Sequence, residues 1–159
     1  MAEPSRRSRA VALAVVLAIP AEGLRQVAYR DPVGTPTLCF GSTKGVKMGD
    51  TATIDQCKAL LTEEMIAAVV QVEKCVPDAP VPVLAAFADA VYNMGPSIAC
   101  NTHGSTAARL LKAGDWTAAC QQLPRWDKAK IAGVLVPLPG LTKRRKAEEE
   151  LCLSYAFSG

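Results

Sequence analysis

Apolar residues gather in one long run near the start of the chain. Residues 10–21 (AVALAVVLAIPA) carry no charge and follow three arginines, Arg6, Arg7 and Arg9. As a helix this run is about 18 Å long, whereas a stable membrane span needs about 20 residues. It predicts a signal or weak membrane anchor, or the buried first helix of a globular domain, and the two are compatible. We expect residues 1–21 to form this basic flank and apolar segment, and residues 22–159 to form the folded domain.

Helical periodicity marks most of the remaining chain. Thr53 and Gln56 form a Thr-x-x-Gln capping box in front of a helix expected from Ile54 to Lys74. Prolines and glycines separate the helices that follow. These further helices are expected at residues 83–93, 107–112, 116–123 and 142–155.

Two segments lack this periodicity. Residues 28–50 are rich in turns, and β-favouring residues between Gly34 and Gly41 predict a small hairpin. Residues 131–141 are apolar but interrupted by prolines and glycines, which indicates an irregular loop. A small β lobe followed by a larger helical lobe is an α+β fold. A cleft between two such lobes is a common place for a substrate site.

Composition narrows the class of protein. The chain has 159 residues, of which 50% are apolar and 21% charged, enough for the core of one domain and too apolar for a disordered chain. The net charge of +3 is smaller than is typical of nucleic-acid-binding proteins, which carry a strongly basic surface. Only 5% of the residues are aromatic, so few side chains could stack on bases. We therefore expect no nucleic-acid partner.

Cysteine usage indicates the compartment. The six cysteines are widely spaced, none lies in a Cys-x-x-Cys pair, and His103 is the one histidine. This spacing disfavours a zinc site, so we expect no metal and no cofactor. It fits a disulfide framework and hence an oxidising compartment, the alternative being six buried free thiols in a cytosolic protein. The cysteines are Cys39, Cys57, Cys75, Cys100, Cys120 and Cys152.

Three residues form the candidate catalytic set. Glu22 ends the nearly charge-free apolar run, where loss of water favours a carboxyl group that keeps its proton. Asp31 lies in a turn, where solvent and backbone donors keep a carboxylate ionised, and Thr37 follows on the expected strand with a hydroxyl able to orient a water. Two carboxyl groups with opposite tendencies suit the hydrolysis of a glycosidic bond. Taken alone, they also fit an ordinary helix-terminal Glu and a turn Asp.

The segments around these residues decide between the two interpretations. Residues 22–25 (EGLR), 28–34 (AYRDPVG) and 37–43 (TLCFGST) closely resemble the catalytic segment of the phage-type lysozymes, glycoside hydrolase family 24. The family motif is Glu, Asp nine residues later and Thr six residues after that. The resemblance implies that Glu22 is the general acid and that Asp31 and Thr37 position and activate water.

The resemblance extends over residues 12–152 and bears on two further residues. Arg144 matches a position near the catalytic glutamate, so we expect it to pair with Glu22 and to contribute to substrate binding. The alternative is a solvated arginine, and the basic run from Lys143 to Lys146 favours a solvated helix face. Trp126 is expected in the core rather than as a platform for a sugar. Residues 127–138 depart from the family by being more apolar.

The resemblance implies a function. It is hydrolysis of the β-1,4 bond between N-acetylmuramic acid and N-acetylglucosamine in peptidoglycan, leading to lysis of a bacterial host. A signal-arrest-release segment would tether the protein transiently to the inner membrane before release into the periplasm. A phage holin is the expected functional partner, and a monomer the expected state. The alternatives are a lytic transglycosylase, against which the presence of Asp31 and Thr37 argues, and a non-catalytic cell-wall-binding module, against which intact Glu22, Asp31 and Thr37 argue.

The sequence alone does not determine how the cysteines pair, but their places in these two lobes favour one scheme. Six cysteines allow about 15 pairings. We expect Cys39–Cys57 at the small lobe, Cys75–Cys100 across the proline-rich connection between two helices, and Cys120–Cys152 between helices of the large lobe.

Overall fold

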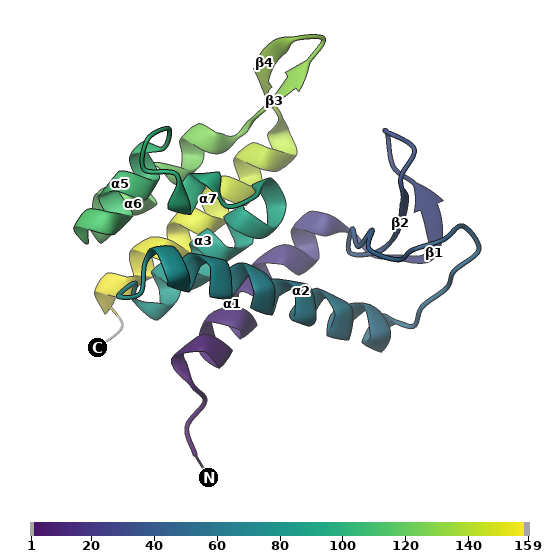
Figure 1. The fold of residues 1–159 in the computed structure, drawn as a ribbon, viewed down its shortest axis with the longest axis horizontal. Helices are drawn as coiled ribbons and strands as arrows, with labels where there is room; N and C mark the ends of the chain where they lie inside the picture. Colours follow the sequence, from purple (N-terminus) through teal and green to yellow (C-terminus); the bar gives the residue numbers. More distant parts are fainter. Residues whose placement is uncertain (1, 158–159) are drawn as a thin grey trace.

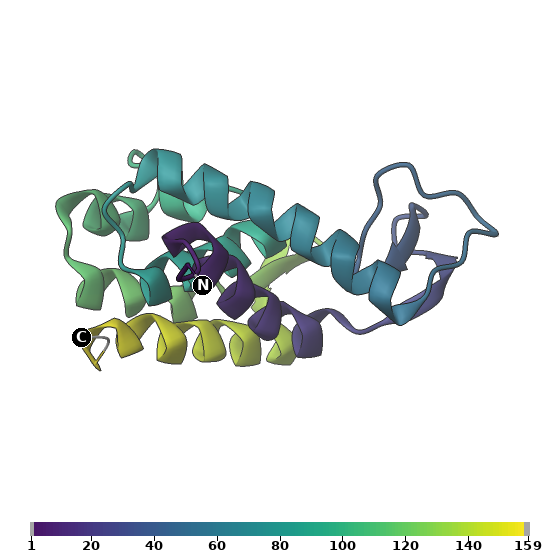
Figure 2. The same cartoon turned by 90° about the horizontal axis from the view of Figure 1, so that it is seen from below.

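The computed structural model describes residues 2–157, which form a helical lobe and a smaller β lobe (Figure 1). The expected α+β class is confirmed. Two antiparallel hairpins project from a bundle of helices, and the long helix α2 extends from the bundle to the β lobe (Figure 2). The elements are α1 (Arg6–Glu22), β1 (Arg25–Arg30), β2 (Pro36–Cys39), α2 (Ile54–Cys75), α3 (Val81–Met94), α4 (Ser97–Cys100), α5 (Thr106–Ala113), α6 (Trp116–Cys120), η1 (Leu123–Trp126), β3 (Lys128–Ile131), β4 (Val134–Pro137), α7 (Pro139–Leu153) and η2 (Ser154–Phe157).

Helix α1 contains the apolar run and packs against α2, α3 and α7. The Ser5 hydroxyl caps its first turn by accepting a hydrogen bond from the Ser8 backbone N–H. Its buried face consists of Ala10, Val11, Ala14 and Ala18, while Val16 on the opposite side is 68% exposed. The run is thus the first helix of the fold. No helix of residues 2–157 has the length and apolarity to cross a bilayer.

Helix α3 forms the centre of the helical lobe. Every residue from Pro82 to Val91 is buried, because α1, α2 and α7 pack around it. Ten buried residues in succession leave no solvent-facing stripe, which is typical of a core helix. One of the ten is the aspartate Asp89.

The β lobe is the hairpin expected around Gly34. Strands β1 and β2 are antiparallel, and Tyr29 lies opposite Thr37. A bridge between Val27 and Thr51 joins the end of the lobe to its first strand. The capping box of Thr53 and Gln56 is present and begins α2 one residue later, as expected.

The expectation of an irregular loop at residues 131–141 is wrong. Strands β3 and β4 pair in register through a two-residue turn, Ala132–Gly133, and both turn residues have positive φ (+50° and +82°). Such a turn matches the twist of the strands it joins. Pro137 ends a strand and Pro139 begins a helix, positions at which proline costs little, so the prolines did not indicate a loop.

Other boundaries shift by a few residues. Helix α7 begins at Pro139 rather than residue 142, and the helix expected to end at residue 123 stops at Cys120. The short helix α4 was not predicted. Trp126 is partly buried against the core, as expected.

Three disulfides connect the six cysteines in the expected pairs. The Cα–Cα distances are 4.9 Å for Cys39–Cys57, 5.4 Å for Cys75–Cys100 and 5.6 Å for Cys120–Cys152. The first links β2 to α2, and the third links α6 to α7. All six cysteines are paired, which excludes the alternative of free thiols in this structure.

Candidate active site

Glu22 is the last residue of α1 and faces the end of strand β2. Gly23, with φ of +69°, ends the helix, and the Glu22 side chain is 21% exposed. A methyl group added to Gly41 would lie 3.3 Å from Glu22 Oε2, so the turn after β2 approaches this carboxyl group closely. The fold therefore brings Glu22 of the helical lobe against the β lobe.

Asp31 follows β1 directly, and the backbone of its own turn holds its carboxylate. Oδ1 accepts hydrogen bonds from the backbone N–H groups of Val33 (3.0 Å) and Thr35 (2.8 Å). Among the described residues no group donates to Oδ2. One oxygen thus fixes the side chain while the other remains able to accept a proton or a hydrogen bond.

Thr37 lies on β2 and shares one partner with Asp31. Its hydroxyl donates to the Thr35 carbonyl (2.9 Å), which also accepts from the Asp31 N–H (3.0 Å). Thr37 is only 3% exposed, so its rotamer is restricted. Thr35 therefore links Asp31 and Thr37, and the structure brings these two residues together on the hairpin.

Arg144 is buried beside Glu22 rather than solvated. Its Nη1 donates to Glu22 Oε1 (2.5 Å), which confirms the expected pairing. Its Nε and Nη2 donate to Asp89 Oδ2 (3.0 Å) and Oδ1 (2.8 Å). Burial lowers the pKa of Arg144, but its bonds to Asp89 and the nearby Glu22 outweigh this and raise that pKa overall. Its contribution to substrate binding stays a prediction.

The basic run Lys143–Lys146 was expected to form a solvated helix face, and this expectation is wrong for its two central residues. Arg144 is 6% exposed and Arg145 is fully buried, because this side of α7 packs on α3. Glu22 accordingly has a buried arginine beside it.

Sequence reasoning missed the buried acidic residues that accompany the two arginines. Asp89 of α3 and Glu148 of α7 are both fully buried, and Arg145 Nε lies 2.8 Å from Glu148 Oε1. Burial, together with the neighbouring Asp89, raises the pKa of Glu148, against the opposing effect of Arg145. A single aspartate within the apolar stretch from Val83 to Val91 was the available signal, because an isolated buried charge requires a partner.

Tyr92 connects this region to the rest of the molecule. Its hydroxyl lies 3.2 Å from Glu64 Oε2 on α2 and 3.3 Å from the Phe40 carbonyl after β2. Burial is the main reason that the pKa of Tyr92 is raised, and Glu64 adds to it. Tyr92 therefore joins three elements, α2, α3 and the turn after β2, close to Glu22.

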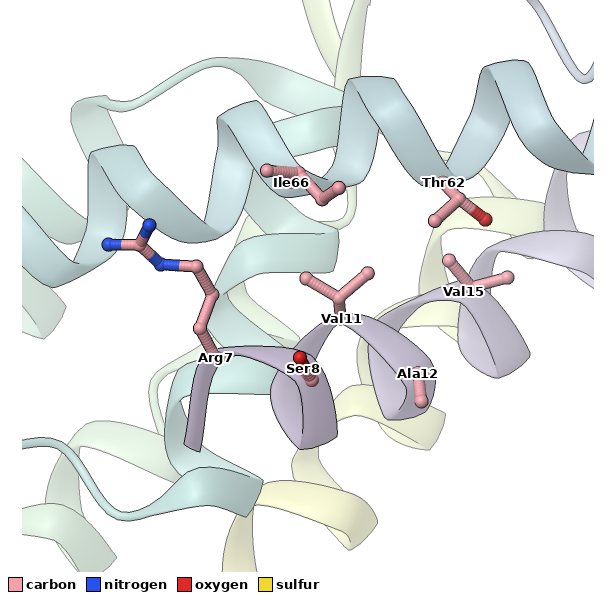
Figure 3. A pocket seen from close by; sticks show the side chains of 7 residues that line it. All are labelled: Arg7, Ser8, Val11, Ala12, Val15, Thr62 and Ile66. Carbon is pink, nitrogen blue, oxygen red and sulfur yellow. The ribbon is translucent and has the colours of Figure 1, made fainter. Parts of the chain in front are cut away.

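One hollow of the surface lies away from these residues. A groove of about 520 Å³ lies between α1 and α2 and is lined by Arg7, Ser8, Val11, Ala12, Val15, Thr62 and Ile66 (Figure 3). A smaller cavity of about 180 Å³ lies between the end of α1 and α7 and includes Arg144. Within residues 2–157 no cluster of three metal-ligating side chains occurs.

Comparison with known proteins decides the family. The model of the family described as phage lysozyme matches residues 20–148, most of the chain. The chain belongs to this phage lysozyme family. The matched residues include Glu22, Asp31, Thr37 and Arg144. The protein is thus a glycoside hydrolase of the lysozyme type.

Individual relatives agree with this assignment to the phage lysozymes. The chain is 41% identical to the SAR-endolysin of Pseudomonas phage phiKMV, over 91% of this chain and 90% of that protein. Its structure is similar to the active form of the P1 phage endolysin Lyz, with a TM-score of 0.76, 29% identity and coverage of 89% and 83%. It is also similar to the muramidase domain of SpmX from Asticaccaulis excentricus, with a TM-score of 0.78, 28% identity and coverage of 88% and 94%.

Proposed function

We propose that this phage lysozyme is an endolysin that hydrolyses the β-1,4 bond between N-acetylmuramic acid and N-acetylglucosamine in peptidoglycan. One observation carries the proposal: Glu22 of the helical lobe meets the turn after β2, while Asp31 and Thr37 share Thr35 on the facing hairpin. The proposed proton donor, Glu22, and the carboxylate with one free oxygen, Asp31, thus lie on separate lobes. This arrangement suits a sugar chain that lies between the two lobes.

The reaction assigns a different task to each residue. Glu22 gives its proton to the glycosidic oxygen, which leaves with the bonding electrons. A water oriented by Asp31 and the Thr37 hydroxyl adds to the anomeric carbon, and its proton passes to the free Oδ2 of Asp31. Inversion at that carbon is expected, provided the two carboxyl groups leave room for the water, about 6.5–9.5 Å apart.

Turbidity loss and analysis of the released fragments test this proposal. Purified protein added to permeabilised Gram-negative cells should lower their turbidity, and the released fragments should carry reducing ends. Fragments that end in anhydro sugars would identify a lytic transglycosylase instead. Binding to peptidoglycan without loss of turbidity would identify a cell-wall-binding module.

We further propose that α1 acts before folding is complete as a signal-arrest-release segment. Arg6, Arg7 and Arg9 would stay cytoplasmic by the positive-inside rule, which places the rest of the chain in the periplasm. The apolar run would hold the protein at the inner membrane, and a phage holin would act as the functional partner for its release. The phiKMV relative's name and the 68% exposure of Val16 on the docked helix support this role.

Tethering would also delay activity. While α1 lies in the bilayer, Glu22 at its end stays at the membrane surface and cannot meet Asp31 and Thr37. After release, the Ala10, Ala14 and Ala18 face packs into the fold and places Glu22 beside the hairpin. The released protein is proposed to act as a monomer.

Cell fractionation tests the tether. Expressing cells should hold the full-length protein in the membrane fraction, and an uncoupler that collapses the membrane potential should move it to the periplasm. Finding it only in the cytosol at full length, or only as a form cleaved near Ala21, would contradict the proposal.

A further inference from the structure

Arg144, which contacts Glu22, is also hydrogen-bonded to a fully buried aspartate, Asp89. We propose that Asp89 is a positioning residue that orients Arg144 toward Glu22 and offsets the positive charge of this arginine beside the general acid. This inference rests on the proposed function, because it concerns the residue that donates the proton.

The geometry makes Asp89 the main partner of Arg144. Its two oxygens accept from Nη2 and Nε at 2.8 and 3.0 Å, a bidentate contact that fixes the plane of the guanidinium group. Only Nη1 then points to Glu22. Asp89 is 0% exposed and Arg144 is 6% exposed, so solvent does not screen this contact as it would at the surface.

Carboxyl groups outnumber guanidinium groups in the set of charged residues around Arg144. Three carboxyl groups, those of Glu22, Asp89 and Glu148, accompany two guanidinium groups, those of Arg144 and Arg145. Each guanidinium group therefore has a carboxyl partner besides Glu22, namely Asp89 for Arg144 and Glu148 for Arg145.

The consequence concerns the general acid. An arginine alone beside a carboxyl group favours its ionised form, which has no proton to donate. A second carboxylate on the far side of the same arginine reduces that effect. Tyr92 on α3 and Arg145 on α7 also interact electrostatically with Glu22, while Glu64 of α2 contacts Tyr92 and Glu148 of α7 pairs with Arg145. Asp89 differs from these groups because it accepts two hydrogen bonds from the arginine that contacts Glu22.

The test is the pH profile of kcat for the Asp89→Asn variant on soluble peptidoglycan fragments. The fall of kcat at high pH reports loss of the general-acid proton in the enzyme–substrate complex. Without the charge of Asp89, Arg144 acts on Glu22 alone, so this fall should move to lower pH by about one unit or more. The Asp89→Glu variant, which restores the charge, should return the fall toward its wild-type position.

Glu73→Gln is the matched control. Glu73 of α2 also pairs with arginines, Arg6 and Arg7, but these begin α1, about 24 Å along that helix from Glu22. Its pH profile should equal that of the wild type. Should Asp89→Asn fail to fold, Asp89→Ser removes the same charge and keeps a hydroxyl that accepts from Arg144.

Two results would overturn the inference. In a folded neutral variant, a high-pH fall that stays in place while kcat drops uniformly would show a purely structural role for Asp89. A fall that moves to higher pH would show that Asp89 does not offset Arg144. Absence of hydrolysis by the wild type itself would instead refute the proposed function, so the two failures are distinguishable.

Discussion

Replacement of Glu22 by glutamine is expected to lower the rate of peptidoglycan hydrolysis by about 10²–10⁴-fold, the usual contribution of general acid catalysis. Glutamine has nearly the same shape and can still accept a hydrogen bond from Arg144, but it has no proton to give to the leaving oxygen. The measurement is the initial rate of turbidity loss in permeabilised cells, normalised to folded protein.

The control for this loss is again Glu73→Gln, which makes the same chemical change at an ion pair remote from the hairpin. Circular dichroism and thermal unfolding should show that both variants are folded. A Glu22→Gln variant with wild-type activity would refute the assignment of Glu22 as the general acid. A Glu73→Gln variant as inactive as Glu22→Gln would show that the loss arises from disturbed packing of α1.

Reduction of the three disulfides is expected to remove most of the stability of the fold. Each bridge closes a loop of 18 to 32 residues in sequence, for which a contribution of about 2–4 kcal/mol is typical. Three such contributions approach the whole free energy of unfolding of an ordinary domain, about 5–15 kcal/mol. Urea unfolding followed by circular dichroism, with and without a phosphine reductant, measures the difference.

A double replacement, Cys75→Ser with Cys100→Ser, separates one bridge from the set. It should lower the free energy of unfolding by about 2–4 kcal/mol in non-reducing conditions. A reduced wild type within about 1 kcal/mol of the oxidised protein would contradict the expected role of the bridges. Non-reducing peptide mapping that links Cys39 into the helical lobe would contradict the pairing itself.

The parts of the fold that could be predicted are those that depend only on residues close together in the sequence. The capping box at Thr53, the hairpin between Gly34 and Gly41 and the spacing of Glu22, Asp31 and Thr37 each need only neighbouring residues. The turn at Ala132–Gly133 escaped detection because alanine rarely adopts positive φ, and the usual signal at such a turn is Asn-Gly.

The buried ion pairs could not be predicted for a different reason. Arg144 and Asp89 are 55 residues apart, and charged residues surround Arg144 on α7. Nothing in that local pattern distinguishes a solvated arginine from one that faces α3. The distinction depends on how α7 packs on α3, which is a property of the assembled core rather than of either helix.

The disulfides attach some elements to the fold covalently, whereas other elements are held by noncovalent contacts alone. All three bridges join residues between Cys39 and Cys152, so no covalent loop encloses α1 or β1. Helix α1 is held by its alanine-rich face and by ion pairs such as those of Arg6 and Arg7 with Glu73. The fully oxidised chain can therefore take up or give up its first helix without breaking a covalent bond, and with that helix goes the residue proposed to donate the proton.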